Sequence, residues 1–332
     1  MKLHSKDKYT MYGYTLSYFS RKLETALQWY GVEYEFRCKS IDIRSLIEKR
    51  SGTHQVPILF TPQDHCMIDT TPTMWFLDER YPERRMFPSG LTGALVQILE
   101  EYLDEWFPRI VLHYRWQYEE CTQFAANVLG REAAPGAADL FSNTIAQWGK
   151  KACRARGISS EEMKRSAEAE WIRTLDALEE QLGQTAFSLG NRPCAVDADL
   201  LGGLRGHFLK DPVPKTVLQN YPRIRSWADT ALHWDGKWEL APFPESTPFA
   251  HFLLKEMAGS YKKYCLSNAV AISGREKAFV CDTEGHSVSY KTNAYTETSR
   301  QLLIQRLTSQ LSSEEYTQFI SFLEAHDLKE IL

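Results

Sequence analysis

The sequence predicts an α/β segment, then an all-helical segment, and then a shorter tail that mixes helices and strands. Three observations predict this order. Strand and helix patterns alternate over roughly the first quarter of the chain, strand signals vanish from Leu91 onward, and the pattern changes again after Pro242. With 332 residues the chain is long enough for about two domains of roughly 150 residues each. We therefore expect segments at 8–85, 90–240 and 241–332.

The first segment reads as β-α-β-α-β-β-α. Aromatic and β-branched residues alternate in its expected strands, and helical spacing from Phe19 to Tyr30 stops at Gly31. The turn at Pro62 makes the last two strands an antiparallel hairpin. The expected strands are 9–14, 32–38, 56–61 and 66–68, and the expected helices are 19–30, 43–50 and 71–81.

The rest of the chain is predicted to be mostly helical. Pro108 should kink or interrupt the helix that begins at Leu91, because proline lacks the N–H that a helix interior needs. Residues 196–209 are apolar on most faces and should be buried. Further helices are expected at 122–155 with breaks, 160–183, 223–232, 247–264, 296–309 and 312–326, and a small hairpin at 278–291.

Composition is ordinary for a soluble globular protein, with 43% hydrophobic and 25% charged residues. The net charge of −4 offers no basic face, so nucleic acid is not an expected partner. No apolar run approaches the ~18–20 residues of a membrane helix, and Met1–Lys8 lacks a secretory apolar core. Seven scattered cysteines without a Cys-x-x-Cys pair suggest neither disulfides nor a metal site, and favour reduced thiols in the cytoplasm.

Two short motifs suggest a binding site. A strand begins at Val56-Pro57, and this bond can be cis at little cost, which turns the preceding backbone outward. Asp69-Thr70 then places a carboxylate, a hydroxyl and free N–H groups at a helix start. Together they could hold a small peptide by its backbone and its charged end. The alternative is that Asp69 and Thr70 merely cap the helix.

This order and these motifs resemble the glutathione transferase superfamily, whose N-terminal half is thioredoxin-like and whose C-terminal half is all-helical. Residues 187–197 (FSLGNRPCAVD) resemble the segment that opens a buried helix in that family, and 221–227 (YPRIRSW) resemble its tyrosine-proline-tryptophan tail. The resemblance covers about residues 9–235, and the tail is similar to that of a poorly characterised bacterial branch. Cys194 and Tyr18 replace the usual Ser/Thr and proline of the family pattern, and Thr70 replaces the usual serine.

The resemblance implies that glutathione is the peptide. The Val56 backbone beside Pro57 would pair with its extended chain, and Gln55 would lie close to its glycine end. Thr70 and the helix N–H groups suit its γ-glutamyl carboxylate, and Asp69 suits its amine. Glutathione would serve as a co-substrate, and no metal is expected.

The thiol should meet a hydroxyl at the start of the first predicted helix. Residues 16–22 are similar to the serine-type start of that helix in the family, which makes Ser17 the expected catalytic donor. Tyr14, Tyr18 and Ser20 are rivals, and a plain helix cap is the alternative role for Ser17. Cys66 lies in a strand, so a catalytic role for its thiol is not favoured.

The expected function is glutathione conjugation of a small electrophile, with activation of the glutathione thiol. His113 and Trp116 share a helical face and could line the second-substrate pocket, although a core face is the preferred interpretation. The alternative function is a non-catalytic binding or structural module with the same fold. A homodimer is what the resemblance implies, and neither the electrophile nor the role of the tail can be read from the sequence.

Overall fold

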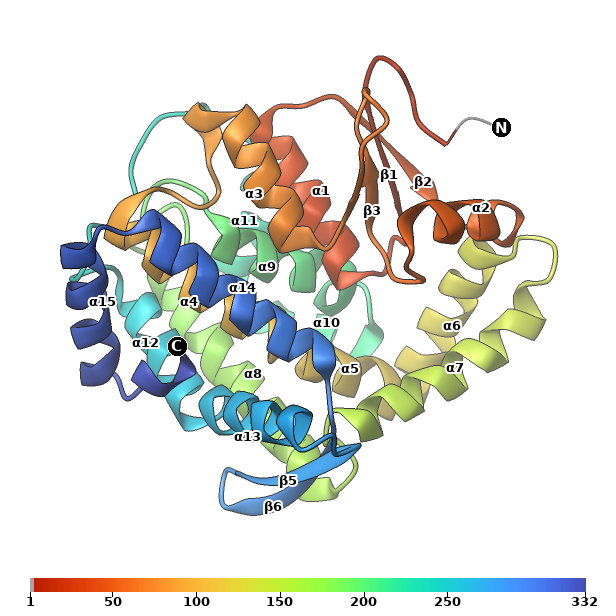
Figure 1. Ribbon diagram of the computed structural model, residues 1–332. Coiled ribbons are helices and arrows are strands. Elements are labelled where there is room, and N and C mark those ends of the chain that lie inside the picture. The colour runs from red at the N-terminus through yellow and green to blue at the C-terminus, as the bar shows by residue number, and fades with distance from the viewer. Residues whose placement is uncertain (1–2) are drawn as a thin grey trace. The chain divides into compact units, whose positions relative to one another are not determined.

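The computed structural model describes residues 3–332, so Met1 and Lys2 of the polar N-terminal stretch lie outside the described residues. The predicted β-α-β-α-β-β-α order is confirmed, with a shorter third strand than expected (Figure 1). The elements are β1 (Tyr9–Gly13), α1 (Tyr18–Tyr30), β2 (Tyr34–Cys38), α2 (Ile41–Ser51), β3 (Ile58–Phe60), β4 (Cys66–Ile68) and α3 (Thr70–Arg80).

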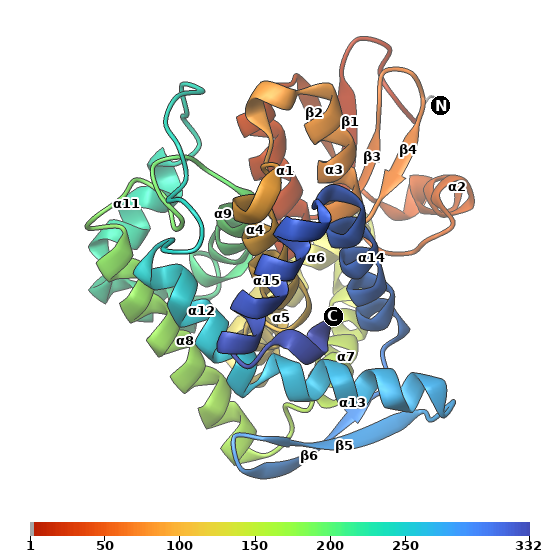
Figure 2. The ribbon, with the colours of Figure 1, turned by 60° about the vertical axis from the view of Figure 1, so that its left-hand side comes forward.

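The four strands form a mixed sheet in the order β2-β1-β3-β4. Strand β1 runs parallel to β2 and antiparallel to β3, and β3 and β4 form the predicted antiparallel hairpin. Helices α1 and α3 lie side by side on one side of the sheet and α2 lies on the other (Figures 1 and 2). Side chains of the sheet and α2 share one apolar cluster: Tyr12, Ile43, Ile47, Ile58 and Phe60.

Glycines end the first two helices as the sequence predicts. Gly31 follows α1 with φ of 69° and donates its N–H to Gln28, and Gly52 follows α2 with φ of 73°. A left-handed residue at this position satisfies a free helix carbonyl, and glycine adopts that conformation without a Cβ clash. These two glycines therefore fix where α1 and α2 end and where the connections to β2 and β3 begin.

Helices dominate from residue 82 to residue 230, and Pro108 separates two of them as expected because it can begin a helix but cannot continue one. The predicted buried segment 196–209 ends in a π-helical turn. The elements are η1 (Pro82–Arg84), α4 (Gly90–Glu105), α5 (Pro108–Gln117), α6 (Glu119–Ala133), α7 (Ala138–Ala155), α8 (Glu161–Gln181), α9 (Ala195–Gly203), η2 (Leu204–Phe208), α10 (Pro212–Val217), η3 (Leu218–Asn220) and α11 (Pro222–Thr230).

The tail contains the predicted hairpin and the last two predicted helices, but the single helix expected at 247–264 is two helices that meet at Ser260, and the second runs to Ser273. Its hairpin turns at Glu284-Gly285, both with positive φ, and lies along α13 (Figure 2). Ser312 and Glu315 form a reciprocal capping box at the start of the last long helix. The elements are α12 (Pro248–Gly259), α13 (Tyr261–Ser273), β5 (Ala278–Thr283), β6 (His286–Lys291), α14 (Ala294–Gln310), α15 (Ser313–Ala325) and η4 (Lys329–Ile331).

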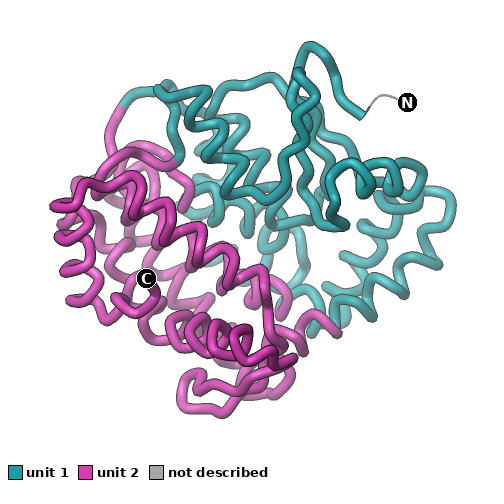
Figure 3. The backbone as a smooth tube through the Cα atoms, in the orientation of Figure 1, with its two compact units in different colours: residues 1–86, 114–150, 197–237 teal, residues 87–113, 151–196, 238–332 magenta. Residues whose placement is uncertain are grey.

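The chain divides into two compact units (Figure 3). Unit 1 comprises residues 1–86, 114–150 and 197–237, and unit 2 comprises residues 87–113, 151–196 and 238–332. Each unit is therefore assembled from three separate stretches of sequence. In the part of the chain that the structure describes, every helix is too short or too polar to cross a membrane.

Unit 2 buries carboxylates of α4 against α13 and α14. Glu101 accepts hydrogen bonds from the hydroxyls of Tyr261 and Ser299, the latter at 2.6 Å, and Glu105 accepts one from Thr296 at 2.5 Å. Burial, and then the nearby Glu105 carboxylate, raise the pKa of Glu101 well above its usual range. These bonds connect the first helix of the unit to the tail.

Candidate functional site

The start of β3 carries the first predicted motif. The Val56–Pro57 peptide bond is cis, and Pro57 is buried where the chain enters the sheet. Val56 precedes the strand, so its backbone N–H and C=O take part in none of the ladder pairs of the described sheet. Gln55 is exposed and donates its own N–H to Thr53 Oγ1 at 3.1 Å. The Val56 backbone therefore offers a donor and an acceptor to an extended ligand.

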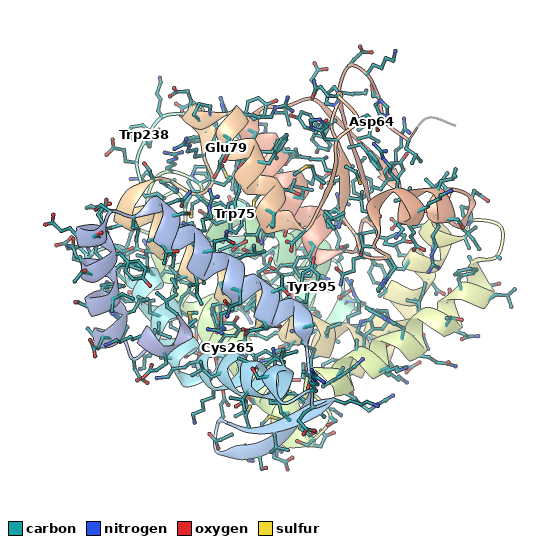
Figure 4. The ribbon with its side chains drawn as sticks, viewed as in Figure 1. Asp64, Trp75, Glu79, Trp238, Cys265 and Tyr295 are labelled. Atoms are coloured by element: carbon teal, nitrogen blue, oxygen red, sulfur yellow. The ribbon has the colours of Figure 1, made fainter. Side chains whose placement is uncertain are left out.

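The second motif stands at the start of α3. Asp69 is the N-cap with φ of 67°, and its carboxylate accepts the Thr71 N–H at 3.2 Å. Thr70 is only 3% exposed, and its hydroxyl makes no hydrogen bond to any described residue. Trp75 and Glu79 mark the course of α3 away from this end (Figure 4). A hydroxyl with no partner among the described residues thus lies at a helix N-terminus, which favours a negatively charged group.

Ser17 is the N-cap of α1. Its backbone is extended, with φ of −102°, and its Oγ accepts the N–H of Ser20 at 3.2 Å. Ser17 therefore does cap the helix, which is the alternative role expected for it, and it does so through one lone pair of its oxygen. A hydroxyl has one proton as well as two lone pairs, and the Ser17 O–H donates to no described residue. Capping and donation to a ligand are compatible in this one side chain.

The rival hydroxyls are less available. Tyr14 donates its hydroxyl to the Lys39 carbonyl at 2.7 Å, and burial raises the pKa of Tyr14. Ser20 is fully buried, and its Oγ accepts the Tyr14 N–H at 3.4 Å. Tyr18 is buried with its ring edge-on to Phe19 at 5.1 Å between centroids. Ser17 is half-buried, and its O–H donates to no described residue, so it stays the expected donor.

Lys39 is a site residue that the sequence analysis missed. Its ammonium lies 2.7 Å from the His54 carbonyl oxygen and 3.0 Å from Glu48, and the side chain is 1% exposed. Burial lowers the pKa of Lys39, although Glu48 opposes that effect. The signal was a lysine directly after the second strand, which by itself also fits a solvated loop. A cation therefore lies beside the backbone that leads into Gln55 and Val56.

Two charged side chains hold the loop before Ser17. Glu132 of α6 accepts the Thr15 N–H at 3.0 Å and also bonds its hydroxyl, while Arg21 Nε donates to the Thr15 carbonyl at 2.9 Å. Glu132 is 117 residues from Thr15 in the sequence, so no local pattern could have indicated it. Side chains therefore hold both the N–H and the C=O of Thr15 in place.

Arg115 holds the same loop one residue further on. Its Nη1 donates to the Leu16 carbonyl and faces Nε2 of His207 at 3.2 Å. Its Nε and Nη2 donate to the Asp211 carboxylate at 3.0 Å, and Nη2 also reaches the Gly206 carbonyl at 2.8 Å. All five guanidinium N–H groups thus have acceptors. Burial, and then the charge of Arg115, lower the pKa of His207 to about 4, so its neutral ring can accept.

Comparison with known proteins follows this geometry. The glutathione S-transferase N-terminal domain family matches residues 11–85, the stretch that contains Ser17, Pro57 and Thr70. This part of the chain is similar to the N-terminal domain of glutathione S-transferases. The predicted fold class, a thioredoxin-like sheet followed by a mostly helical remainder, is confirmed.

Solved structures of glutathione S-transferase family members and relatives are only distantly similar to this chain. The β-etherase LigF of Sphingobium sp. strain SYK-6 is 17% identical with a TM-score of 0.49, over 69% of this chain and 96% of that one. A glutathione S-transferase of Rhodospirillum rubrum F11 is 16% identical with a TM-score of 0.47, over 74% and 99%. A glutathione transferase family member of Pseudomonas fluorescens pf-5, crystallised with two glutathione molecules, is 11% identical with a TM-score of 0.45, over 70% and 91%. No curated protein matches this chain.

The residues expected to line the second-substrate pocket are buried on α5. His113 is 1% exposed, and its Nε2 lies 2.8 Å from the Glu168 carboxylate. Burial lowers the pKa of His113. Trp116 is 2% exposed, and its ring contacts the helix backbone at Gly149 so closely that a Cβ there would clash. Both side chains have the environment of a core face.

The thiols of the chain are poorly suited to nucleophilic chemistry. Cys66 lies in β4, and burial raises the pKa of its thiol. Burial also raises the thiol pKa of Cys38, of Cys121 to about 11, and of Cys265 to about 12. These four thiols therefore do not favour a cysteine-type site, which leaves Ser17 as the expected donor.

Proposed function

We propose that this protein binds glutathione along the entry to β3 and at the start of α3, and activates its thiol for attack on a small electrophile. The observation that carries the proposal is the Thr70 hydroxyl, which has no partner among the described residues, inside a matched glutathione S-transferase N-terminal domain. Such a hydroxyl at a helix N-terminus is suited to a carboxylate. Homodimers in the cytoplasm are part of the proposal.

The proposed ligand position uses both ends of the tripeptide. The Val56 N–H and C=O pair with its extended backbone in the manner of an added strand. Thr70 and the N–H groups of α3 bind the γ-glutamyl carboxylate, and Asp69 binds the amine. Gln55 and the Lys39 ammonium lie on the side of the glycine carboxylate, because Lys39 is bonded to the His54 carbonyl next to Gln55.

The chemical step is formation of a thiolate beside Ser17. A free thiol has a pKa of about 8.5, and lowering it to about 6.5 requires roughly 2.7 kcal/mol of extra stabilisation of the anion. One hydrogen bond to a charged group contributes about 1.5–3 kcal/mol, and a helix N-terminus contributes about 0.3–1 kcal/mol. The Ser17 O–H and the start of α1 together suffice, and the thiol proton leaves to solvent. The sulfur then forms a bond to the electrophilic carbon. In a substitution the leaving group departs with its electron pair, whereas in epoxide opening or conjugate addition the C–O or C=C electron pair is released and takes up a proton from water.

Calorimetry with glutathione tests the binding step. Thr70→Val keeps the side-chain shape but removes the hydroxyl, so glutathione should bind roughly 10- to 100-fold more weakly, as expected for a lost hydrogen bond to a charge. Thr317→Val on exposed α15 is the control and should bind normally. Absence of any heat of binding at millimolar glutathione in the unmodified protein would rule out the proposal.

A conjugation assay distinguishes the enzyme from the alternative module. The protein is mixed with glutathione and a panel of electrophiles that react by substitution, by epoxide opening and by addition. Thioether formation above the uncatalysed rate, lost in Ser17→Ala, supports the enzyme. Glutathione binding without turnover across the panel would instead favour a non-catalytic binding module.

A further inference from the structure

Two histidines of the tail face each other. His251 lies in α12 and His326 is the C-cap of α15, 75 residues further along the chain. Nδ1 of His251 is 3.3 Å from Nε2 of His326. Both side chains are half-buried, and both belong to unit 2. The pair is remote in sequence from every residue assigned above to glutathione.

In each ring, the nitrogen that faces away from the other histidine contacts a backbone carbonyl, and this contact shows which nitrogen carries the proton. Nε2 of His251 is 2.8 Å from the Glu245 carbonyl oxygen, and Nδ1 of His326 is 2.9 Å from the Phe322 carbonyl oxygen. A carbonyl can only accept, so each outward nitrogen carries the N–H. In the neutral rings the two inward nitrogens then carry lone pairs 3.3 Å apart, and an added proton or a metal ion between them relieves their repulsion.

The spacing of the inward nitrogens suits a transition-metal ion. Imidazole nitrogens bind Zn²⁺ at 2.0–2.1 Å, so two of them on a tetrahedral ion lie about 3.3 Å apart. Metal-bound histidines usually donate their other N–H to a carbonyl or carboxylate, and both rings do so here. The His326 ring is also fixed by the Phe322 ring, with centroids 4.3 Å apart. The pair is therefore oriented before any ion binds.

We propose that His251 and His326 form a surface binding site for a divalent transition-metal ion such as Zn²⁺. Imidazole is a preferred ligand of Zn²⁺, Cu²⁺ and Ni²⁺, and water would complete the coordination because the rings are half-exposed. The ion would clip α12 to α15. It would stabilise the folded tail, because the unfolded chain does not hold the two rings together.

Equilibrium dialysis with Zn²⁺ after chelator treatment tests the site. The unmodified protein should retain one equivalent more than either His251→Gln or His326→Gln. His286→Gln, at an exposed position of the same tail, should match the unmodified protein. The difference between variants is the readout, because the cysteines can bind Zn²⁺ elsewhere. Equal retention by all four proteins would overturn the proposal.

Histidine-selective ¹⁵N NMR tests the site in the unmodified protein, so its result does not depend on whether the variants fold. Zn²⁺ should shift the resonances of His251 Nδ1 and His326 Nε2, and it should raise the thermal midpoint of unfolding. If neither resonance shifts when Zn²⁺ is added, the metal site is refuted. An N–H proton found between the rings would then show that the two histidines share a hydrogen bond instead.

Discussion

Ser17 combines a structural and a chemical capacity in one hydroxyl. Its lone pair caps α1 through the Ser20 N–H, and its proton is free to donate. A cap alone stabilises a helix by about 1 kcal/mol and gives no reason for the proton to face a ligand. The two roles can therefore be separated by comparing this serine with another N-cap serine of the same chain.

Replacing Ser17 by alanine should cost about 1 kcal/mol of stability and most of the thiolate absorbance of bound glutathione, with binding affinity largely kept. Ser160→Ala is the matched control, because Ser160 Oγ accepts the Met163 N–H at 3.3 Å in the same way at the start of α8. The control should lose similar stability and no thiolate. Ultraviolet difference spectra and urea unfolding measure both effects, and unchanged absorbance in Ser17→Ala would remove this residue from the role.

Glu132 introduces a negative charge next to the loop that carries Ser17. Glu132→Gln keeps an oxygen for the Thr15 N–H but removes that charge. Because a nearby carboxylate destabilises a thiolate, the thiol pKa of bound glutathione should fall in this variant. The thiol pKa is measured by following the thiolate absorbance as the pH is changed. Glu168→Gln is the control: it changes a carboxylate that is bonded to His113, and the thiol pKa of bound glutathione should stay unchanged. A rise in the thiol pKa of Glu132→Gln would contradict this account.

At the scale of elements, Arg115 connects α5 to the π-helical turn η2 and to the loop before α1. The carbonyls of Leu16 and Gly206 and the Asp211 carboxylate all depend on this one side chain. An extra residue in a helical turn re-aims backbone carbonyls, and π-helical turns often occur at functional sites for that reason. The position of the Ser17 loop thus depends on a helix nearly a hundred residues away.

Arg115→Met should lower the free energy of unfolding by about 3–5 kcal/mol, because it leaves Asp211 buried and uncompensated. Asp211→Asn should cost a comparable amount, and the double variant should cost less than the two singles together. Arg44→Met removes an exposed pair with Glu48 and should cost at most about 1 kcal/mol. Urea denaturation measures all four, and strictly additive costs would show that the pair is not coupled.

Local sequence patterns predicted most elements of this fold. Glycine stops, proline positions and hydroxyl caps predicted the order of strands and helices along the chain, because each acts within a few residues. The same local signals indicated Ser17 and Thr70 at helix starts. Glu132, Arg115 and Lys39 could not be predicted, since their contacts are set by packing between distant segments. The facing of His251 and His326 has the same origin.

At the scale of the whole molecule, stability should depend on pH through unit 2. The pKa of Glu101 is raised in the folded state, chiefly by burial, so the folded protein binds this proton more tightly than the unfolded chain. The resulting stabilisation is complete below the ordinary glutamate range near 4.5 and is lost as pH rises through the folded pKa.

Glu101→Gln should therefore flatten the fall in stability as the pH is raised from the ordinary glutamate range, because the amide is always neutral. Urea midpoints measured across that range for the unmodified protein and the variant test this. Glu314→Gln, at an exposed position of α15, should follow the unmodified curve. Parallel curves for Glu101→Gln and the unmodified protein would show that the carboxyl does not titrate abnormally.

The division of the chain has a consequence for how the protein is made. The backbone passes from one unit to the other after residues 86, 113, 150, 196 and 237, so neither unit is an uninterrupted stretch. Tyr261 and Ser299, whose hydroxyls bond the buried Glu101, follow all of unit 1 in the sequence. During translation, unit 2 therefore cannot complete these bonds until α13 and α14 have been synthesised.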